Sequence, residues 1–190
     1  MTTTKIMKFC LISEIIKYDG TQLKSHWIYD MTGIMGDALA SFTGPADVPL
    51  TNMVDLADVK AKEHIFSTSM LHFIVEHFET DLTTMILRQR LLTAIAAETL
   101  KKFGCKDVLR KGDDLYDGEK KLSVSIATAS PVSCLIHFAI NIKSDRTPVP
   151  TMGLSDYDID PKRFADEVSR RYVDEMETIG TARCKVRAVP

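Results

Sequence analysis

The residues of this 190-residue sequence that could do chemistry concentrate between positions 107 and 142. A lysine on a strand that faces a pocket offers a compact cation, which can hold a carboxylate and a phosphate together while negative charge develops between them. Lys121 follows a predicted turn in this segment and is the candidate catalytic residue. The alternative is a solvated lysine, the usual fate of a Gly-Glu-Lys-Lys run.

Asp117 and Gly118 predict the tight turn of a β-hairpin, since glycine readily adopts the positive φ that such a turn needs. The arm after the turn, residues 120 to 126, alternates with a period of two, as a strand does. This alternation places Lys120 and Lys121 on opposite faces, so Lys120 is expected to lie in solvent.

Hydroxyl, imidazole and amide groups follow along the same segment. Ser123 and Ser125 lie on the second arm, and the next apolar run, residues 134 to 142, has His137 and Asn141 as its only polar members. We expect these four side chains to bind a substrate. No histidine and aspartate lie at a recognisable nucleophile spacing from the serines, which argues against a serine hydrolase.

Arg110, Asp113 and Asp114 precede the turn and are further candidate substrate-binding residues. The carboxylates could hold a magnesium ion, accept a hydrogen bond from a ribose or an amide, or cap the hairpin, and Arg110 could meet a phosphate. Adjacent carboxylates on a strand point to opposite faces, which argues against a paired general acid and base. The alternative is a self-neutralising surface cluster.

Residues 65 to 78 predict a strand that carries His72, Glu76 and His77. The zinc motif HxxEH requires two histidines four residues apart on a helix. The pattern here, HxxxEH, is one residue too long and lies on a predicted strand. No metal site is therefore predicted, and His72 is instead expected to line a pocket as a substrate-binding residue.

The central segment resembles the catalytic core of the biotin and lipoate protein ligases, where a pattern such as (P/R)ND(I/L)Y-x-DG-x-K(I/V)(A/S)G precedes a second strand that ends in GINV or HGTLLLN. Asp114 falls on the aspartate of the first pattern, Lys121 on its lysine and Asn141 on the asparagine of the second strand. His137 takes the place of the histidine of HGTLLLN. The whole chain is more narrowly similar to an uncharacterised prokaryotic family, domain of unknown function 366.

The resemblance implies the α/β fold shared by class II aminoacyl-tRNA synthetases and biotin/lipoate ligases. It implies an acyl-activating or acyl-transferring enzyme in which Lys121 acts while a small carboxylic acid attacks the α-phosphate of ATP, with Mg²⁺ as cofactor and a protein as possible acceptor. Residues 67 to 72 contain neither the glycines nor the arginines of the ligase substrate loop, and Val124 replaces a glycine. These differences favour the alternative, a non-catalytic module that binds a small molecule.

Composition narrows the possible partners and location. A net charge of −2 gives no electrostatic reason to expect nucleic acid or an anionic membrane as a partner. The four cysteines lie far apart with no CxxC pair, which indicates reduced thiols in a cytoplasmic protein.

Periodicity and turn residues predict the remaining elements and a single domain over residues 1–190. Strands are expected at 5–17, 65–78 and 183–189, helices at 22–39, 81–104 and 160–180, a turn at 44–47, a surface connection at 144–158, and irregular structure with a possible short helix at 48–62. Interleaved strands and helices with hairpins among them argue for a mixed, mostly antiparallel sheet covered by helices. Sheet edges in the implied fold commonly pair between subunits, so a homodimer is expected.

Overall fold

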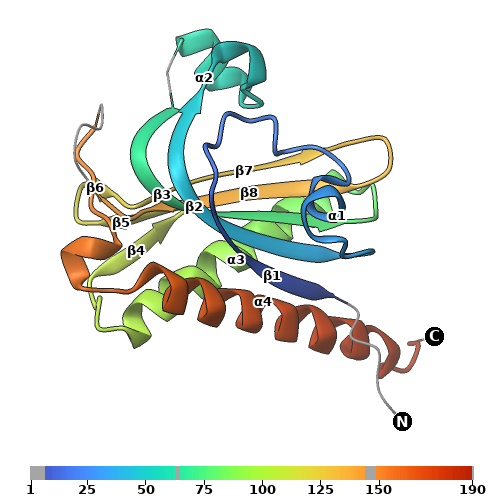
Figure 1. The fold of residues 1–190 in the computed structure, drawn as a ribbon. Coiled ribbons are helices and arrows are strands. Elements are labelled where there is room, and N and C mark those ends of the chain that lie inside the picture. The colour runs from blue at the N-terminus through green and yellow to red at the C-terminus, as the bar shows by residue number, and fades with distance from the viewer. Residues whose placement is uncertain (1–6, 63–64, 144–148, 190) are drawn as a thin grey trace.

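The computed structural model describes residues 7–62, 65–143 and 149–189. Its main sheet has the strand order β1-β2-β3-β8-β7 (Figure 1). Neighbouring strands are antiparallel except β1 and β2, which are parallel. The prediction of a mixed, mostly antiparallel sheet is confirmed. The strands are β1 Lys8–Ile15, β2 Ala38–Val48, β3 Ile65–His77, β7 Ser123–Ala129 and β8 Cys134–Asn141.

Two long helices, α3 Leu82–Lys102 and α4 Pro161–Cys184, cover one face of this sheet (Figure 1). Asp81 and Asp160 cap their first turns, because each carboxylate accepts hydrogen bonds from two backbone N–H groups that have no partner within the helix. The positions at which both helices begin agree with the predicted ranges 81–104 and 160–180.

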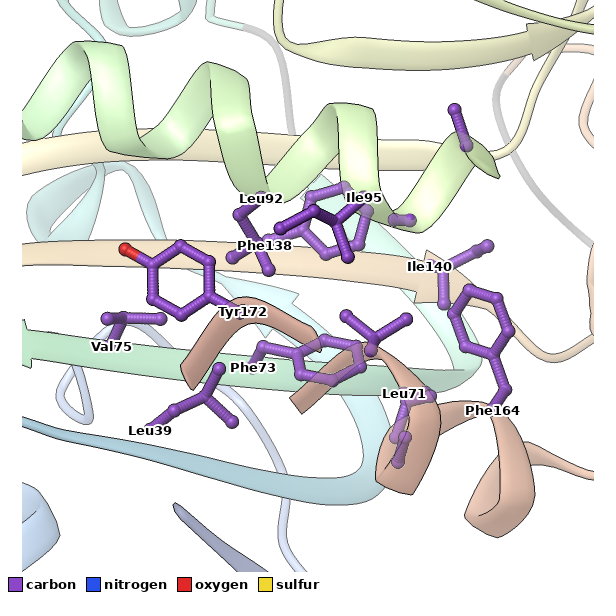
Figure 2. Packing of buried hydrophobic residues seen from close by; sticks show 14 of the residues in the cluster. Leu39, Leu71, Phe73, Val75, Leu92, Ile95, Phe138, Ile140, Phe164 and Tyr172 are labelled. Atoms are coloured by element: carbon purple, nitrogen blue, oxygen red, sulfur yellow. The ribbon is translucent and has the colours of Figure 1, made fainter. Parts of the chain in front are cut away.

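The main core lies between these helices and the sheet (Figure 2). Phe73 of β3 and Phe138 of β8 are fully buried there, and each such side chain contributes about 1.5–3 kcal/mol of hydrophobic stabilisation. Because alternate residues of a strand face the same side, the residues between these core positions must point to the opposite face. The core therefore holds β3 and β8 rigidly and directs the intervening residues, among them His72 and His137, away from α3 and α4.

That opposite face is only partly covered. Trp27 and Ile28 of the short helix α1 Trp27–Thr32 pack with Phe42 and Ile74 on the half of the sheet nearest β1. The short helices η1 Leu50–Asn52 and α2 Leu56–Ala61 follow β2 in the chain. The half of the face near β7 and β8 is bordered by small or polar residues, among them Ala139 and Asn141.

A second sheet contains β4 Val108–Lys111, β5 Asp114–Asp117 and β6 Lys120–Lys121. β5 and β6 form the predicted hairpin, with Gly118 at a φ of 56° in its turn. The predicted strand 120–126 is nevertheless divided at Leu122. The Leu122 N–H donates to Leu115 of β5 at 2.8 Å, whereas its carbonyl accepts from Asn141 of β8 at 2.9 Å. The chain thus passes from one sheet to the other immediately after Lys121.

The prediction of a helix over residues 22–39 is wrong for most of its length. Helix α1 ends where Gly33 adopts a φ of 70°, and Gly36 has a φ of 92°, after which β2 begins at Ala38. Both φ values belong to the left-handed region, which stops a right-handed helix.

The turn predicted at residues 44–47 is also wrong, because β2 continues through it with a shift of register between Gly44 and Ala46. A Cβ atom on Gly44 would lie 1.9 Å from the carbonyl oxygen of Ile16. This glycine therefore permits a close approach of two backbone segments instead of a reversal.

At the C-terminus, helix α4 runs past Gly180 to Cys184, and the strand predicted at 183–189 is absent from the described residues. One glycine in an exposed helix costs about 1 kcal/mol and does not by itself end the helix. The start of the predicted strand 5–17 and residues 144–148 of the predicted connection lie outside the described residues. Within the part of the chain that is described, no helix has both the length and the apolar character of a membrane span.

Candidate functional site

A cavity of about 520 Å³ lies on the face of the main sheet that α3 and α4 leave uncovered. This volume is within the range of small-molecule sites. It is bounded by residues of β3, β7 and β8, by the β5–β6 hairpin, and by the segment from Val48 to Asp58. Seven of the nine predicted site residues line it: Asp113, Asp114, Lys121, Ser123, Ser125, His137 and Asn141.

Lys121 and Asp114 form an ion pair across the β5–β6 hairpin, with Nζ 2.7 Å from Oδ2 and side-chain exposures of 30% and 19%. Burial raises the pKa of Asp114 above its ordinary value, although the hydrogen bond and charge of Lys121 oppose the shift. Burial would lower the pKa of Lys121, but its hydrogen bond to Asp114 and the Asp114 charge outweigh burial and raise it. The Lys121 ammonium therefore stays charged on the cavity wall.

The second oxygen of Asp114, Oδ1, is buried and has no hydrogen-bond partner in the described structure. A buried carboxylate oxygen without a partner costs free energy, since it has lost water and gained nothing in return. The charge on this oxygen is therefore compensated chiefly by Lys121, which pairs with the other oxygen of the same carboxylate.

Asp113 lies in the two-residue turn between β4 and β5, not on a strand as predicted, and it faces helix α3. Its carboxylate accepts hydrogen bonds at 3.0 Å from both Gln89 and Arg90. Gln89 also donates to Ser125 at 2.9 Å. These bonds connect the turn and β7 to α3, so Asp113 and Ser125 position the hairpin.

Ser123 and Asn141 make hydrogen bonds within the protein as well. The Ser123 hydroxyl accepts from the backbone N–H of Leu115 at 2.8 Å. The Asn141 amide accepts from Ser67 at 3.3 Å and donates to the carbonyl oxygen of Lys121 at 3.4 Å. Asn141 therefore holds the end of β8 against the residue that carries the candidate catalytic ammonium.

His137 and His72 form a buried pair, with His72 Nδ1 3.1 Å from His137 Nε2. His72 Nε2 lies 3.2 Å from the carbonyl oxygen of Gly44. Tyr18 stacks on both rings, with its centroid 3.7 Å from that of His137 and 5.3 Å from that of His72. Burial lowers the pKa of His72 to about 4 and that of His137 well below its usual range, so both rings are neutral at neutral pH.

Two predicted site residues do not line the cavity. His72 is fully buried and is connected to the cavity through its contacts with two lining residues, His137 and Tyr18. Arg110 is exposed on β4, where its guanidinium donates to the carbonyl oxygen of Gly112. The expectations of a pocket-lining His72 and of a phosphate contact by Arg110 do not match this geometry, because Arg110 lies on the outer part of the second sheet.

Sequence reasoning missed several lining residues. Tyr18 is one of them, although an aromatic residue directly before Asp-Gly could have suggested a ring packed against a site. The charged and amide side chains among those missed are Asn52, Asp55, Asp58 and Glu119, and the other hydroxyl-bearing ones are Ser67, Tyr116 and Thr151. Tyr18, Asn52, Asp55 and Asp58 come from the segments before β3, whose position next to the hairpin depends on the tertiary fold.

Charge on the described lining is mostly negative. Lys121 is its one cation, and the acids are Asp55, Asp58, Asp113, Asp114 and Glu119. Across residues 7–62, 65–143 and 149–189, no group of three or more His, Cys, Asp or Glu side chains could hold a metal ion. Lys121 is consequently the cationic side chain of the described lining that can contact an anionic ligand.

The fold places the chain in a fold class: it is the class II synthetase-like fold that the biotin/lipoate protein ligases also have. The chain is similar to the putative lipoate protein ligase Ta0514 from T. acidophilum with bound lipoic acid, with a TM-score of 0.57, 14% identity, and coverage of 89% of this chain and 85% of that chain. It is also similar to the biotin protein ligase from Aquifex aeolicus in complex with biotin and ATP, with a TM-score of 0.57, 18% identity, and coverage of 88% and 72%. At these identities the likeness shows the fold alone.

Within this class the chain belongs to the family described as Domain of unknown function (DUF366), whose model matches residues 7–187. An uncharacterised protein of Methanocaldococcus jannaschii is 37% identical over 183 residues, which cover 93% of this chain and 82% of that protein. A protein of unknown function from Pyrococcus horikoshi has a solved structure with a TM-score of 0.92 and 37% identity, covering 97% of this chain and 100% of that chain. The predicted resemblance is confirmed at both levels.

Proposed function

We propose that this protein binds a small carboxylic acid in the cavity and activates or transfers its acyl group. Lys121 is the candidate catalytic residue, because its ammonium can stabilise the negative charge that develops on the reacting carboxylate. The observation that carries the proposal is the half-buried Lys121 ammonium on the cavity wall, 2.7 Å from a carboxylate whose other oxygen has no partner.

The ion pair with Asp114 gives Lys121 the properties that this role requires. Asp114 holds the ammonium in one position, and an incoming carboxylate can share it without displacing Asp114, since an ammonium has three donors. Hydrogen bonds from Gln89 and Arg90 to Asp113 fix the turn that precedes β5. The cation is thus preorganised, which reduces the free energy spent on ordering it during the reaction.

ATP with Mg²⁺ is the cofactor that acyl activation would use. A free triphosphate would face five acidic side chains and one cation on the described lining, so these residues fit the nucleotide only as its magnesium complex. Lys121 is the cationic side chain of the described lining that would hold its phosphates. When bound, the nucleotide would supply the electrophilic phosphorus that the carboxylate attacks.

Isotope exchange between pyrophosphate and ATP, measured over a panel of small carboxylic acids with Mg²⁺ present, tests acyl activation. We expect exchange with at least one acid and a loss of about a hundredfold or more in Lys121→Ala, the scale seen when one charge-stabilising donor is removed from an active site. Lys120→Ala is the matched control, because Lys120 is an exposed lysine on the same short strand. Absence of exchange with every acid, together with unchanged acid binding by Lys121→Ala, would remove the proposal.

A non-catalytic binding module is the second candidate, and one observation favours it. The described residues that line the cavity include no arginine and no glycine, the residue types with which a loop can wrap phosphates. A binding module predicts a small molecule that copurifies with the protein and is released on denaturation, with no turnover. Mass spectrometry of the released fraction, combined with the exchange assay, separates the two functions.

The proposal also includes one domain over residues 1–190, a cytoplasmic location, a homodimer and a protein as possible acyl acceptor. Strand β1 supports the homodimer, because it lies at the edge of the main sheet and Ile15 at its end is exposed. Light scattering coupled to size exclusion measures the mass in solution. A monomer at micromolar concentration would remove the dimer from the proposal and leave the site unaffected.

A further inference from the structure

We propose that His137 presents an unprotonated Nδ1 to the cavity and that the substrate carries an N–H or O–H donor at the end that meets it. This inference rests on the proposed function for the carboxylate end of the substrate and adds the chemistry of its opposite end. It predicts an acid with an amide, ureide or hydroxyl group, in contrast to one whose far end is a hydrocarbon or a disulfide alone.

The protonation pattern follows from the chain of contacts through His72. The carbonyl oxygen of Gly44 can only accept a hydrogen bond, so His72 Nε2, 3.2 Å away, must carry a proton. A neutral imidazole has one N–H, which leaves His72 Nδ1 as an acceptor. His137 Nε2, 3.1 Å from that atom, must then be the donor. By the same rule, His137 Nδ1 is left without a proton.

Burial supports the neutral form of both rings, since a charged imidazolium in this environment would lose its hydration. Burial lowers the pKa of His72 to about 4, and burial together with the neighbouring His72 lowers that of His137. The stacked Tyr18 ring, 3.7 Å from His137 between centroids, restricts rotation of the imidazole. The orientation of the two nitrogens is therefore set by the protein before a ligand binds.

His137 Nδ1 is open to a ligand. It has no hydrogen-bond partner in the described structure. The side-chain atoms there that lack both a partner and any exposed surface are Asp114 Oδ1 and Ser169 Oγ, so His137 Nδ1 keeps some exposed surface. His137 itself is 4% exposed and lines the cavity. A ligand that closes over this acceptor without donating to it would leave a buried polar atom unsatisfied, which costs binding free energy.

The position of His137 along β8 sets the length of the substrate. His137 and Asn141 lie on the same face of β8, four residues apart, which corresponds to about 13 Å between their backbones. The Asn141 side chain contacts the backbone of Lys121. Ala139, between them on that face, is buried in a cluster with Met70 and Val124, and these two side chains line the cavity. An acid of medium length can therefore contact Lys121 and His137 together.

Calorimetric titration with two matched pairs of acids tests the preference. Biotin and lipoic acid have the same acid chain, but only the biotin head carries N–H groups. Octanoic acid and its terminal hydroxyl derivative differ in one O–H. We expect the donor-carrying member of a pair that fits the cavity to bind about tenfold tighter, the effect of one satisfied buried acceptor. His137→Phe retains an aromatic ring beside Tyr18 and should abolish the difference, whereas His26→Phe, at an exposed histidine outside the cavity, should preserve it.

The protonation of His137 can be measured on the unaltered protein, which keeps the inference testable if His137→Phe does not fold. Long-range proton–nitrogen correlation spectra of ¹⁵N-histidine-labelled protein distinguish protonated from unprotonated ring nitrogens. We expect an unprotonated Nδ1 at about pH 7. A protonated Nδ1, equal affinities within both pairs, or binding of none of the four acids overturns the inference. A preference for donor-carrying acids without pyrophosphate exchange supports this inference and removes acyl activation. Exchange without such a preference supports acyl activation and overturns this inference.

Discussion

Replacing Lys121 by methionine breaks the ion pair with Asp114 and keeps an unbranched side chain of similar size. In the native protein Nζ lies 2.7 Å from Asp114 Oδ2, while Oδ1 has no partner. The variant would therefore leave a carboxylate in the cavity wall with neither its counterion nor a full set of hydrogen bonds. We expect this uncompensated charge, and not the loss of packing, to dominate the change in stability.

The magnitude follows from the burial of the pair. Exposed ion pairs contribute about 0–1 kcal/mol, whereas removing one partner of a fully buried pair costs about 3–5 kcal/mol. With side chains 30% and 19% exposed, this pair lies between these limits, so Lys121→Met should lower the free energy of unfolding by about 2 kcal/mol.

Replacing the other partner of the ion pair, Asp114, should destabilise the protein much less. Burial raises the pKa of Asp114, which means that the carboxylate is held in the folded state at a net cost in spite of Lys121. Asp114→Asn removes that cost and leaves a lysine that water can reach. We expect a change within about 1 kcal/mol for Asp114→Asn, and a double variant that is more stable than Lys121→Met by at least about 1 kcal/mol.

Urea denaturation of the two single variants and the double variant at about pH 7 measures these differences. Lys120→Met is the control, because a substitution at an exposed position should change stability by no more than about 0.5 kcal/mol. If Lys121→Met and Lys120→Met were equally stable, or if Asp114→Asn failed to rescue Lys121→Met, the ammonium would be screened by solvent. The argument for a preorganised cation would then be wrong.

Three further predictions concern the scaffold. Gly44→Ala should destabilise the protein by about 2–3 kcal/mol in denaturant titration, because its Cβ would meet the Ile16 carbonyl oxygen at 1.9 Å; a change below about 1 kcal/mol would contradict the close approach. Asp81→Ala should lower the free energy of unfolding by about 1 kcal/mol through loss of the α3 cap. Thermal melts followed by circular dichroism measure this change, and an unchanged melting temperature would contradict it. Burial opposes the charge of Asp37, but hydrogen bonds from His77 and a backbone N–H outweigh burial and lower the pKa of Asp37. The stabilisation that Asp37 contributes is therefore present above about pH 4 and is lost as the pH falls through the pKa of the folded state. Asp37→Asn should remove this loss from the free energy of unfolding measured against pH.

Elements that depend on local signals could be predicted from the sequence. Helix α3 follows from the cap at Asp81 and a periodic apolar face, and the β5–β6 turn follows from Gly118. Strand β3 follows from its β-forming composition. In each case the residues that decide the conformation are neighbours in the chain, so reading a short window is sufficient.

The wrong predictions involve signals that have two meanings until distant residues are known. Gly33 and Gly36 lie in an apolar pattern of helical period, but their left-handed backbone conformation ends the helix. Gly44 has the composition of a turn, yet its contact is with Ile16 on a neighbouring segment. Gly180 was expected to end α4, but the helix continues through it. A glycine alone indicates freedom of conformation and does not say how that freedom is used.

For the site, the local pattern and the family resemblance led to Lys121 and Asp114, which form an ion pair across the β5–β6 hairpin. Residue types alone could not separate His137, on the cavity wall, from His72, which is fully buried, since both alternate correctly along their strands. Tyr18 enters the site from a segment more than a hundred residues before Lys121, so no pattern near the hairpin could have indicated it.

By itself the sequence determined the helices with strong caps, the turn of the hairpin and the placement of an ammonium beside a carboxylate, because these depend on residues close together in the chain. The tertiary structure decided which of those side chains share a cavity, which ring nitrogen of His137 is free, and which acids surround Lys121. The physical reason is that burial, charge and hydrogen-bond partners arise from segments that meet only when the sheet and its helices have packed.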